Sequence, residues 1–205
     1  MAKGQLIGLL GRAGSGKDTV ADAIIESVGL SQANRGIVRI AFADKLKDVV
    51  SDVYGIPRYY FDDRVLKNTP HKKLGGKTPR QAAQVIGTEG FRNLIDQNTW
   101  TNYAMANARE WIEEGTNVII TDIRFDGEFS AVKDDGYPVL HIYRDISLCE
   151  QHDHESERNI DRLAEMADRR IDNTGTIEDL KRIAVETAME IFEGTSPANR
   201  MLWVA

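Results

Sequence analysis

Residues 10–19 read LGRAGSGKDT, and their types and spacing are suited to binding phosphate groups. At all but one position the stretch follows the pattern G-x-x-x-x-G-K-[ST], whose backbone N–H groups and lysine surround phosphate oxygens. The members of this predicted nucleotide-binding loop are Gly11, Arg12, Ala13, Gly14, Ser15, Gly16, Lys17, Asp18 and Thr19. We predict that Lys17 contacts the β- and γ-phosphates of a nucleoside triphosphate, and that a helix beginning there directs its positive end toward them.

The exception in this pattern is Asp18, which stands where a hydroxyl normally contacts Mg²⁺. A carboxylate oxygen still suits Mg²⁺, which is a hard cation that prefers oxygen ligands. The extra negative charge is unfavourable beside a triphosphate unless the metal or Lys17 offsets it, and Thr19 offers a hydroxyl to the α-phosphate one residue later. The sequence therefore favours a rearranged metal shell. It leaves open whether Asp18 binds the metal directly, binds it through water, or helps to position the acceptor.

A loop of this kind needs a strand before it and a helix after it. Apolar runs bounded by turns predict buried parallel strands at residues 5–10, 37–42, 117–121, 138–143 and, more weakly, 169–171. Apolar stripes of helical period lie between them, at residues 20–28, 46–53 and 177–191, and Thr176 with Asp179 forms a predicted capping box for the last. Strands that alternate with helices predict an α/β fold with a parallel sheet.

A second group of chemically capable residues follows the third predicted strand. The stretch TDIRFDGEFSAV, residues 121–132, reads as strand, turn and helix, and we expect it to direct Asp122, Arg124 and Glu128 toward the ligand crevice of the sheet. Such positions line the crevice at the carboxyl ends of strands in open α/β sheets. The alternative is a surface turn with solvated charges.

A third group lies in residues 77–92, KTPRQAAQVIGTEGFR. Pro79 fits the first turn of a helix capped by Thr78, which places Arg80 and Gln84 one turn apart on one face. Arg80 could bind a phosphate bidentately and Gln84 could pair with the edge of a base.

Gly87 and Thr88 lie one turn farther along, and Trp100 offers a flat surface on which a base could stack. Each has an ordinary alternative, because a tryptophan is more often core and an arginine such as Arg80 is more often a solvated surface charge. Together with the phosphate loop they favour an acceptor of nucleotide size.

Two segments, residues 55–80 and 149–158, are polar and turn-rich, and we expect both to close over a bound substrate. The chain of 205 residues is 41% hydrophobic and carries a net charge of −6, which predicts one globular domain and argues against nucleic-acid polymers and membrane surfaces as partners. The single cysteine, Cys149, cannot form an intramolecular disulfide and fits a reducing compartment. The apolar stretch near the start is too short for a signal peptide, and no run approaches the ~20 residues of a membrane span, so we expect a cytoplasmic protein.

In chain order, GRAGSGKDT, KTPRQAAQVIGTEGFR, Trp100 and TDIRFDGEF resemble the deoxynucleoside monophosphate kinases of tailed bacteriophages. The resemblance covers roughly residues 5–175, and the GKDT variant with Asp18 is itself a feature of that family. The stretch from Thr78 to Arg92 is the more specific block, because phosphomevalonate kinases also resemble the GKDT block.

The resemblance implies a P-loop kinase fold, with a parallel sheet of about five strands flanked by helices, in one domain over residues 1–205. It implies an acceptor-binding insert at about 55–100 and a lid at about 145–168. It further implies Mg²⁺-dependent transfer of the γ-phosphate of ATP to deoxynucleoside 5′-monophosphates, for phage DNA precursor synthesis in the host cytoplasm.

Motif matching implies catalytic roles for Lys17, Asp18, Asp122 and Arg124. The residues implied to bind ATP are those of the loop together with Asn173 and Gly175. Those implied to bind the acceptor are Arg80, Gln84, Gly87, Thr88, Trp100, Asp122, Arg124 and Glu128. Arg144 and Arg158 flank an acidic stretch in the lid segment, and neither is assigned as a lid arginine.

Three other functions stay open on the sequence. One is a P-loop kinase for another phosphorylated acceptor, such as dephospho-coenzyme A or phosphomevalonate. Another is a switch or assembly ATPase that needs no acceptor, and the third is a phosphate-binding module in which Asp18 spoils the metal site. A homodimer is also open, through an apolar contact of Trp111, Ile112 and the closing stretch NRMLWVA.

Overall fold

The computed structural model describes residues 3–31, 36–145 and 155–193, and the chain divides into two compact units. Unit 1 combines residues up to 41 with residues from 105 onward, and unit 2 is Phe42–Ala104. The predicted acceptor-binding insert, residues 55–100, falls within unit 2, whereas residues 146–154 of the predicted lid, with Cys149, lie outside the described residues. The single kinase domain that we predicted stays a prediction.

Unit 1 is built on a five-stranded sheet in the order β2-β3-β1-β4-β5, in which every neighbouring pair is parallel. The strands are β1 (Leu6–Leu10), β2 (Ile37–Ile40), β3 (Asn117–Ile123), β4 (Val139–Tyr143) and β5 (Arg169–Asp172). All five predicted strands are thus confirmed, as is the α/β fold class. β1 is central and buried at every residue, which explains why its sequence is apolar without alternation.

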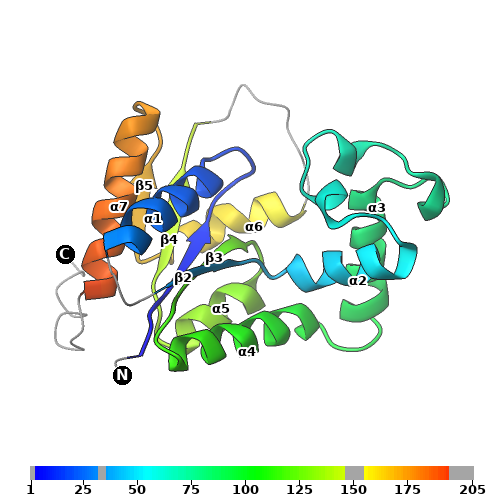
Figure 1. Cartoon of the computed structure of the whole chain (residues 1–205), viewed down its shortest axis with the longest axis horizontal. Coiled ribbons are helices and arrows are strands. Elements are labelled where there is room, and N and C mark those ends of the chain that lie inside the picture. The colour runs from blue at the N-terminus through cyan, green and yellow to red at the C-terminus, as the bar shows by residue number, and fades with distance from the viewer. Residues whose placement is uncertain (1–2, 32–35, 146–154, 194–205) are drawn as a thin grey trace. The chain divides into compact units, whose positions relative to one another are not determined.

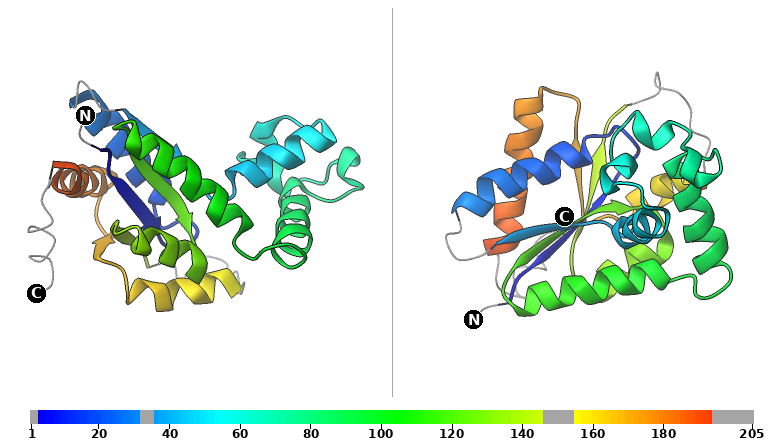
Figure 2. Two further views of the ribbon diagram at one scale, coloured as in Figure 1. Left: turned by 90° about the horizontal axis from the view of Figure 1, so that it is seen from below. Right: turned by 45° about the vertical axis from the view of Figure 1, so that its right-hand side comes forward.

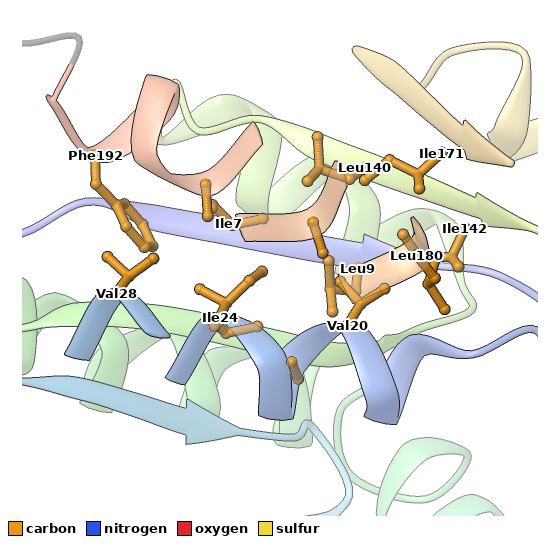
Figure 3. Packing of buried hydrophobic residues seen from close by; sticks show 14 residues of the cluster. Ile7, Leu9, Val20, Ile24, Val28, Leu140, Ile142, Ile171, Leu180 and Phe192 are labelled. Carbon is orange, nitrogen blue, oxygen red and sulfur yellow. The ribbon is translucent and has the colours of Figure 1, made fainter. Parts of the chain in front are cut away.

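Helices cover both faces of this sheet (Figures 1 and 2). On one face, α1 (Lys17–Ser31) and α7 (Ile177–Glu193) pack against each other; Figure 3 shows Val20 and Leu180 directed toward Leu9 of β1. On the other face lie α5 (Asp126–Asp134) and α6 (Glu155–Ala164). A further helix, α4 (Thr99–Glu113), begins in unit 2 and continues into unit 1. None of the helices in the described parts of the chain is long and apolar enough to cross a membrane.

The start of α7 confirms the predicted capping box. The backbone N–H of Asp179 donates to the Thr176 hydroxyl oxygen over 3.1 Å, and that hydroxyl donates to the Asp179 carboxylate over 2.7 Å. The Thr176 backbone N–H also donates to this carboxylate over 3.2 Å, and the two hydrogen bonds that the carboxylate accepts from Thr176 lower the pKa of Asp179. The cap fixes where α7 begins, directly after the loop that contains Asn173 and Gly175.

Unit 2 has its own core, formed by Leu46, Val50, Ile56, Phe61, Leu74, Ala82 and Trp100. Its elements are α2 (Asp44–Tyr54), the 3₁₀ turns η1 (Arg58–Phe61), η2 (Leu66–Asn68) and η3 (Lys72–Leu74), α3 (Pro79–Gln84) and the π-helix η4 (Val85–Arg92). The apolar stripe that we predicted for residues 46–53 holds for Leu46 and Val50 but is wrong for Val53, which is 71% exposed. Val53 lies in the C-terminal turn of α2, where Asp52 and Tyr54 are exposed as well.

Residues 55–80, which we expected to be a mobile connection, are held by ion pairs within unit 2. The Arg58 guanidinium contacts the carboxylates of Asp44 at 2.9 Å and Asp48 at 2.8 Å, and it also pairs with Asp62. These contacts join η1 to α2, and the three 3₁₀ turns satisfy part of the backbone in the segment. Closure of this segment over a substrate stays a prediction.

Candidate active site

The phosphate loop joins β1 to α1, as the motif requires, and Lys17 is the first residue of α1. The Lys17 side chain is buried, and its Nζ donates to the carbonyl oxygens of Gly11 over 2.6 Å and Arg12 over 2.8 Å. The amine is therefore held at the concave side of the loop, at the positive end of the α1 dipole. An ammonium group in this position is suited to binding phosphate oxygens.

Ser15 provides an independent sign that the loop binds a polar ligand. The residue is 1% exposed, and its hydroxyl has no hydrogen-bond partner among the residues that the structure describes. A buried hydroxyl without a partner costs on the order of 1–3 kcal/mol, so such groups in native proteins call for an explanation. A phosphate oxygen in the loop would supply the acceptor that this hydroxyl lacks.

Asn173 fixes the backbone of the loop from the end of β5. Its side-chain Nδ2 donates to the Ser15 carbonyl oxygen over 2.9 Å, and its backbone N–H donates to the Tyr143 carbonyl oxygen over 2.7 Å. Gly16 has a φ of +106°, and a Cβ there would lie 2.7 Å from Asn173 Nδ2. Residue 16 must therefore be glycine both for its backbone torsion and for its contact with Asn173.

The contact with ATP that we expected of Asn173 and Gly175 stays a prediction, because the contact shown by Asn173 is with the loop. Gly175 is exposed just before α7. Of the remaining loop residues, Ala13 and Gly14 are exposed and Thr19 is half-buried in α1.

Two ion pairs in this part of unit 1 were not predicted. Arg12 of the loop binds the Asp161 carboxylate of α6 through two guanidinium nitrogens. Asp18, whose side chain is 79% exposed, pairs with Arg39 of β2. A charged residue inside the otherwise apolar strand IVRI was the sequence signal that could have directed attention to Arg39.

The implied Mg²⁺ fits the residues present. The described residues contain no group of three or more His, Cys, Asp or Glu side chains that could hold a metal ion by themselves. Mg²⁺ in nucleotide sites is usually held by one or two carboxylates together with phosphate oxygens and waters, so no larger protein cage is needed. Asp18 offers such a carboxylate at the start of α1.

The turn after β3 holds the second predicted group. Asp122 is the residue before the last in β3, and Arg124 directly follows the strand. Both are half-buried. We expected the Glu128 side chain to point toward the ligand crevice together with Asp122 and Arg124, but it is used within the turn. It is 6% exposed, and its carboxylate accepts hydrogen bonds from the backbone N–H groups of Arg124 at 2.9 Å and Phe125 at 3.1 Å.

Glu128 thus caps the N-terminus of α5 and fixes the turn that carries Arg124. A negative charge there is also favoured by the helix dipole. A direct contact of Glu128 with substrate stays a prediction.

The third group lies in unit 2, where the predicted cap of α3 is confirmed. The Thr78 hydroxyl accepts a hydrogen bond from the Gln81 backbone N–H at 3.1 Å, and the Gln81 side chain accepts one from the Thr78 N–H at 2.9 Å. Arg80, Gln84 and Thr88 are exposed on this segment, whose chain continues as the π-helix η4. Such wide turns occur often at functional sites.

Gly87 and Trp100, in contrast, belong to the core of unit 2. Trp100 is 8% exposed, its Nε1–H donates to the Gly87 carbonyl oxygen at 3.2 Å, and its ring packs on Phe91 at 4.8 Å between centroids. A Cβ on Gly87 would lie 2.4 Å from a Leu46 methyl carbon, so glycine there allows close packing against α2. The structure shows packing roles for both residues, and base stacking on Trp100 stays a prediction.

His141 was not singled out from the sequence. It lies in β4, opposite Leu10 of β1 and near the phosphate loop, and it is 9% exposed. Burial, and next the positive charge of Arg170, lower the pKa of His141. Its signal in the sequence is a single polar residue within the apolar run VLHIY.

Neither Arg144 nor Arg158 is assigned as a lid arginine, and the Arg158 side chain, like residues 146–154, lies outside the described residues. Arg144 is exposed at the end of β4. For the dimer contact, Ile112 is buried in the molecule and Trp111 is 40% exposed, while the closing stretch NRMLWVA lies outside the described residues.

Comparisons with known proteins identify the family and the fold. The family model described as deoxynucleotide monophosphate kinase matches residues 65–183, more than half of the chain. A putative deoxynucleotide monophosphate kinase of Acanthamoeba polyphaga mimivirus is 29% identical over 149 residues, which cover 68% of this chain and 74% of that protein.

Solved structures show the same fold at low sequence identity. An APS kinase of Mycobacterium tuberculosis in complex with AMPPNP and APS superimposes with a TM-score of 0.51 and 13% identity, over 92% of this chain and 99% of that one. A shikimate kinase of Aquifex aeolicus gives a TM-score of 0.50 and 11% identity, over 91% and 97% of the two chains. The fold is therefore that of the P-loop kinases, and by its family match the chain belongs to the deoxynucleotide monophosphate kinase family.

Proposed function

We propose that this kinase transfers the γ-phosphate of ATP to deoxynucleoside 5′-monophosphates, giving the diphosphates and ADP. The observation that carries the proposal is the phosphate loop of unit 1. Its buried Lys17 amine lies at the N-terminus of α1 with the Ser15 hydroxyl, which has no hydrogen-bond partner in the described part of the chain, and an anionic ligand is favoured there.

In the proposed reaction, an oxygen of the acceptor phosphate forms a bond to the γ-phosphorus. The bond from that phosphorus to the bridging oxygen of ADP breaks, and ADP leaves with the electron pair. The acceptor phosphate is ionised near neutral pH, so no strong general base is required. The work of the protein is positioning and charge neutralisation, as in phosphoryl transfer generally.

Each charged residue then has a defined part. Lys17 exchanges its hydrogen bonds to the loop carbonyls for contacts with the phosphates, and Arg124 balances charge on the transferring group. Asp122 orients the acceptor, while Asp18 is the carboxylate that would hold Mg²⁺. When bound with ATP, this metal would supply positive charge that offsets the charge of the phosphates.

On the acceptor side we propose that Arg80 binds the monophosphate and that Gln84 and Thr88 contact the nucleoside. Support comes from the exposure of these three side chains on α3 and η4 and from the match of the family model to this region. Trp100 is buried, and in this scheme it supports the η4 segment through its hydrogen bond to Gly87, while stacking of a base on its ring stays a prediction.

The first experiment is a coupled ADP-release assay with ATP and Mg²⁺. It is run against each of the four deoxynucleoside monophosphates, dephospho-coenzyme A, phosphomevalonate and a control without acceptor. We expect turnover with one or more deoxynucleotides only. Turnover equal to the control would indicate an ATPase, and turnover with either other acceptor would replace the proposed substrate.

Two variants test the residue roles. Lys17→Ala should reduce kcat/KM by on the order of 10³-fold, whereas Lys181→Ala, an exposed lysine of α7, should leave it unchanged. Arg80→Ala should raise KM for the acceptor without changing KM for ATP. Activity of Lys17→Ala close to that of the wild type would rule out the loop as the site of transfer.

We further propose that the deoxynucleoside diphosphates serve as precursors of viral DNA. The support is the resemblance to phage kinases and the relative in a virus. If the gene is carried by a phage, its deletion should lower the deoxynucleoside diphosphate pools of infected cells, and unchanged pools would contradict this role.

A further inference from the structure

Arg39 links the edge of the sheet to the start of α1. It lies in β2, and its guanidinium contacts two carboxylates on one face of α1: Nη1 lies 3.0 Å from Asp22 Oδ1, and Nη2 pairs with Asp18. The Arg39 side chain is 34% exposed, whereas those of Asp18 and Asp22 are 79% and 60% exposed. The arginine is therefore the most buried of the three side chains, and it contacts both carboxylates.

Without this arginine, the negative charges of Asp18 and Asp22 would repel each other. Residues four apart on a helix are neighbours, and like charges at this spacing repel each other. Asp18 also directly follows Lys17, so its charge opposes the approach of a triphosphate to the loop. One uncompensated unit charge at about 4 Å changes an equilibrium constant by about fivefold even in water.

We infer that Arg39 is a positioning residue for ATP, which neutralises the Asp18–Asp22 pair so that the loop can accept the triphosphate. The inference rests on the proposed function insofar as ATP is the ligand. Arg39 acts through Asp18 and does not itself contact the phosphates. Its importance should therefore depend on the carboxylate at position 18.

A purely structural role predicts that the loss of Arg39 lowers the melting temperature and leaves ATP binding unchanged. We expect the melting temperature to change hardly at all, because exposed ion pairs contribute little to stability. Its loss should instead weaken ATP binding, most strongly when no metal offsets the charge of Asp18. Because the effect is electrostatic and near the surface, it should shrink as the salt concentration rises.

The test measures ATP binding by titration calorimetry, once in EDTA and once with Mg²⁺, for Arg39→Gln, Arg39→Lys and the wild type. For Arg39→Gln we expect Kd for metal-free ATP to rise about fivefold to tenfold, with a smaller rise for Mg²⁺-ATP. Arg39→Lys should stay within about twofold of the wild type because it keeps the charge. Arg182→Gln removes an α7 arginine that pairs with Glu186 and serves as the matched control.

The decisive comparison uses Asp18→Ser, which restores the usual hydroxyl. Adding Arg39→Gln to Asp18→Ser should change Kd by less than about twofold, since the charge that Arg39 offsets is gone. An equal loss in both backgrounds would overturn the inference and indicate direct contact of Arg39 with ATP. Unchanged binding by Arg39→Gln would overturn it as well.

These outcomes are separable from failure of the proposed function. If the wild type binds ATP but phosphorylates no deoxynucleotide, the acceptor proposal fails while the role of Arg39 is still measured by binding. If the wild type does not bind ATP, both fail.

Discussion

The side-chain amide of Asn173 donates a hydrogen bond to the carbonyl oxygen of Ser15, which joins the end of β5 to a loop 158 positions earlier in the chain. The same asparagine is tied through its backbone N–H to Tyr143 of β4. The phosphate loop is thus held by two strands that lie far from it in the sequence. Its geometry depends on the sheet as a whole and not on the glycines alone.

Replacing Asn173 by alanine should weaken ATP binding about fivefold, because a hydrogen bond of this kind contributes about 1 kcal/mol and here fixes the loop backbone. Titration calorimetry with ATP measures the change. Asn68→Ala is the control, since Asn68 also donates to a backbone carbonyl, that of Arg64, at 2.9 Å in unit 2. An effect on ATP that is equal in both variants would contradict this role of Asn173.

Gly16→Ala and Gly14→Ala separate steric overlap from backbone strain. Both glycines have positive φ, +106° and +78°, so alanine is strained at either position. Only at position 16 would a Cβ meet a neighbour, Asn173 Nδ2 at 2.7 Å, whereas at position 14 no described atom lies within 4 Å. We expect Gly16→Ala to lose at least tenfold more ATP affinity than Gly14→Ala, and similar losses would show that strain alone matters.

Glu128→Ala should destabilise unit 1 by on the order of 1–3 kcal/mol, because it leaves the N–H groups of Arg124 and Phe125 without their carboxylate partner. It should also lower kcat, because the turn that carries Arg124 is released. Urea unfolding and steady-state kinetics measure the two effects. Asp126→Asn, which removes one partner of an exposed pair with Arg162, should cost less than about 1 kcal/mol, and a comparable cost would argue against the cap.

His141 should make stability depend on pH below about 6.5, the ordinary pKa of histidine. Burial, and next the positive charge of Arg170, lower its pKa in the folded protein; Asp161 and Asp172 oppose this with smaller effects, and Lys17 lowers the pKa by the least. The unfolded chain therefore binds a proton before the folded one does. The free energy of unfolding should fall as the pH drops below 6.5. The contribution of His141 to this fall should end once the pH is below the pKa of His141 in the folded protein.

Urea titrations at several pH values measure this dependence. His141→Phe lacks the titrating group, so its free energy of unfolding should lose that part of the slope between pH 5 and 7, a range set by the ordinary pKa of about 6.5. A wild type and variant with parallel profiles would contradict the assignment.

Features governed by short stretches of chain could be predicted from the sequence. The five strands follow from apolar runs that parallel, doubly covered strands require, and the caps at Thr78 and Thr176 follow from hydrogen bonds that span three residues. The phosphate loop is equally local, because one glycine-rich turn between a strand and a helix contains most of its donors. Each of these patterns can be recognised from neighbouring residues, whereas the hydrogen bond from Asn173 that holds the loop cannot.

Features that depend on packing could not be predicted in this way. Trp100 has the chemistry of a base-stacking surface, but the core of unit 2 supplies Phe91 and the Gly87 carbonyl as its partners. The pairing of Arg39 with Asp18 depends on the β2-β3-β1 order of the sheet, which no periodicity encodes. The π-helix of residues 85–92 likewise follows from contacts that its own sequence does not reveal.

The central place of β1 in the sheet has a consequence for how the protein is made. During translation β1 leaves the ribosome before the other four strands, yet its register partners include Val118 on β3 and Leu140 on β4, more than 100 positions later. Until those strands emerge, β1 is an apolar segment with both edges unpaired, which favours aggregation and engagement by chaperones. We therefore expect pulse-labelled hydrogen exchange to show that the backbone of β1 and the adjoining loop is protected late, so that the strand synthesised before the other four is among the last to become structured.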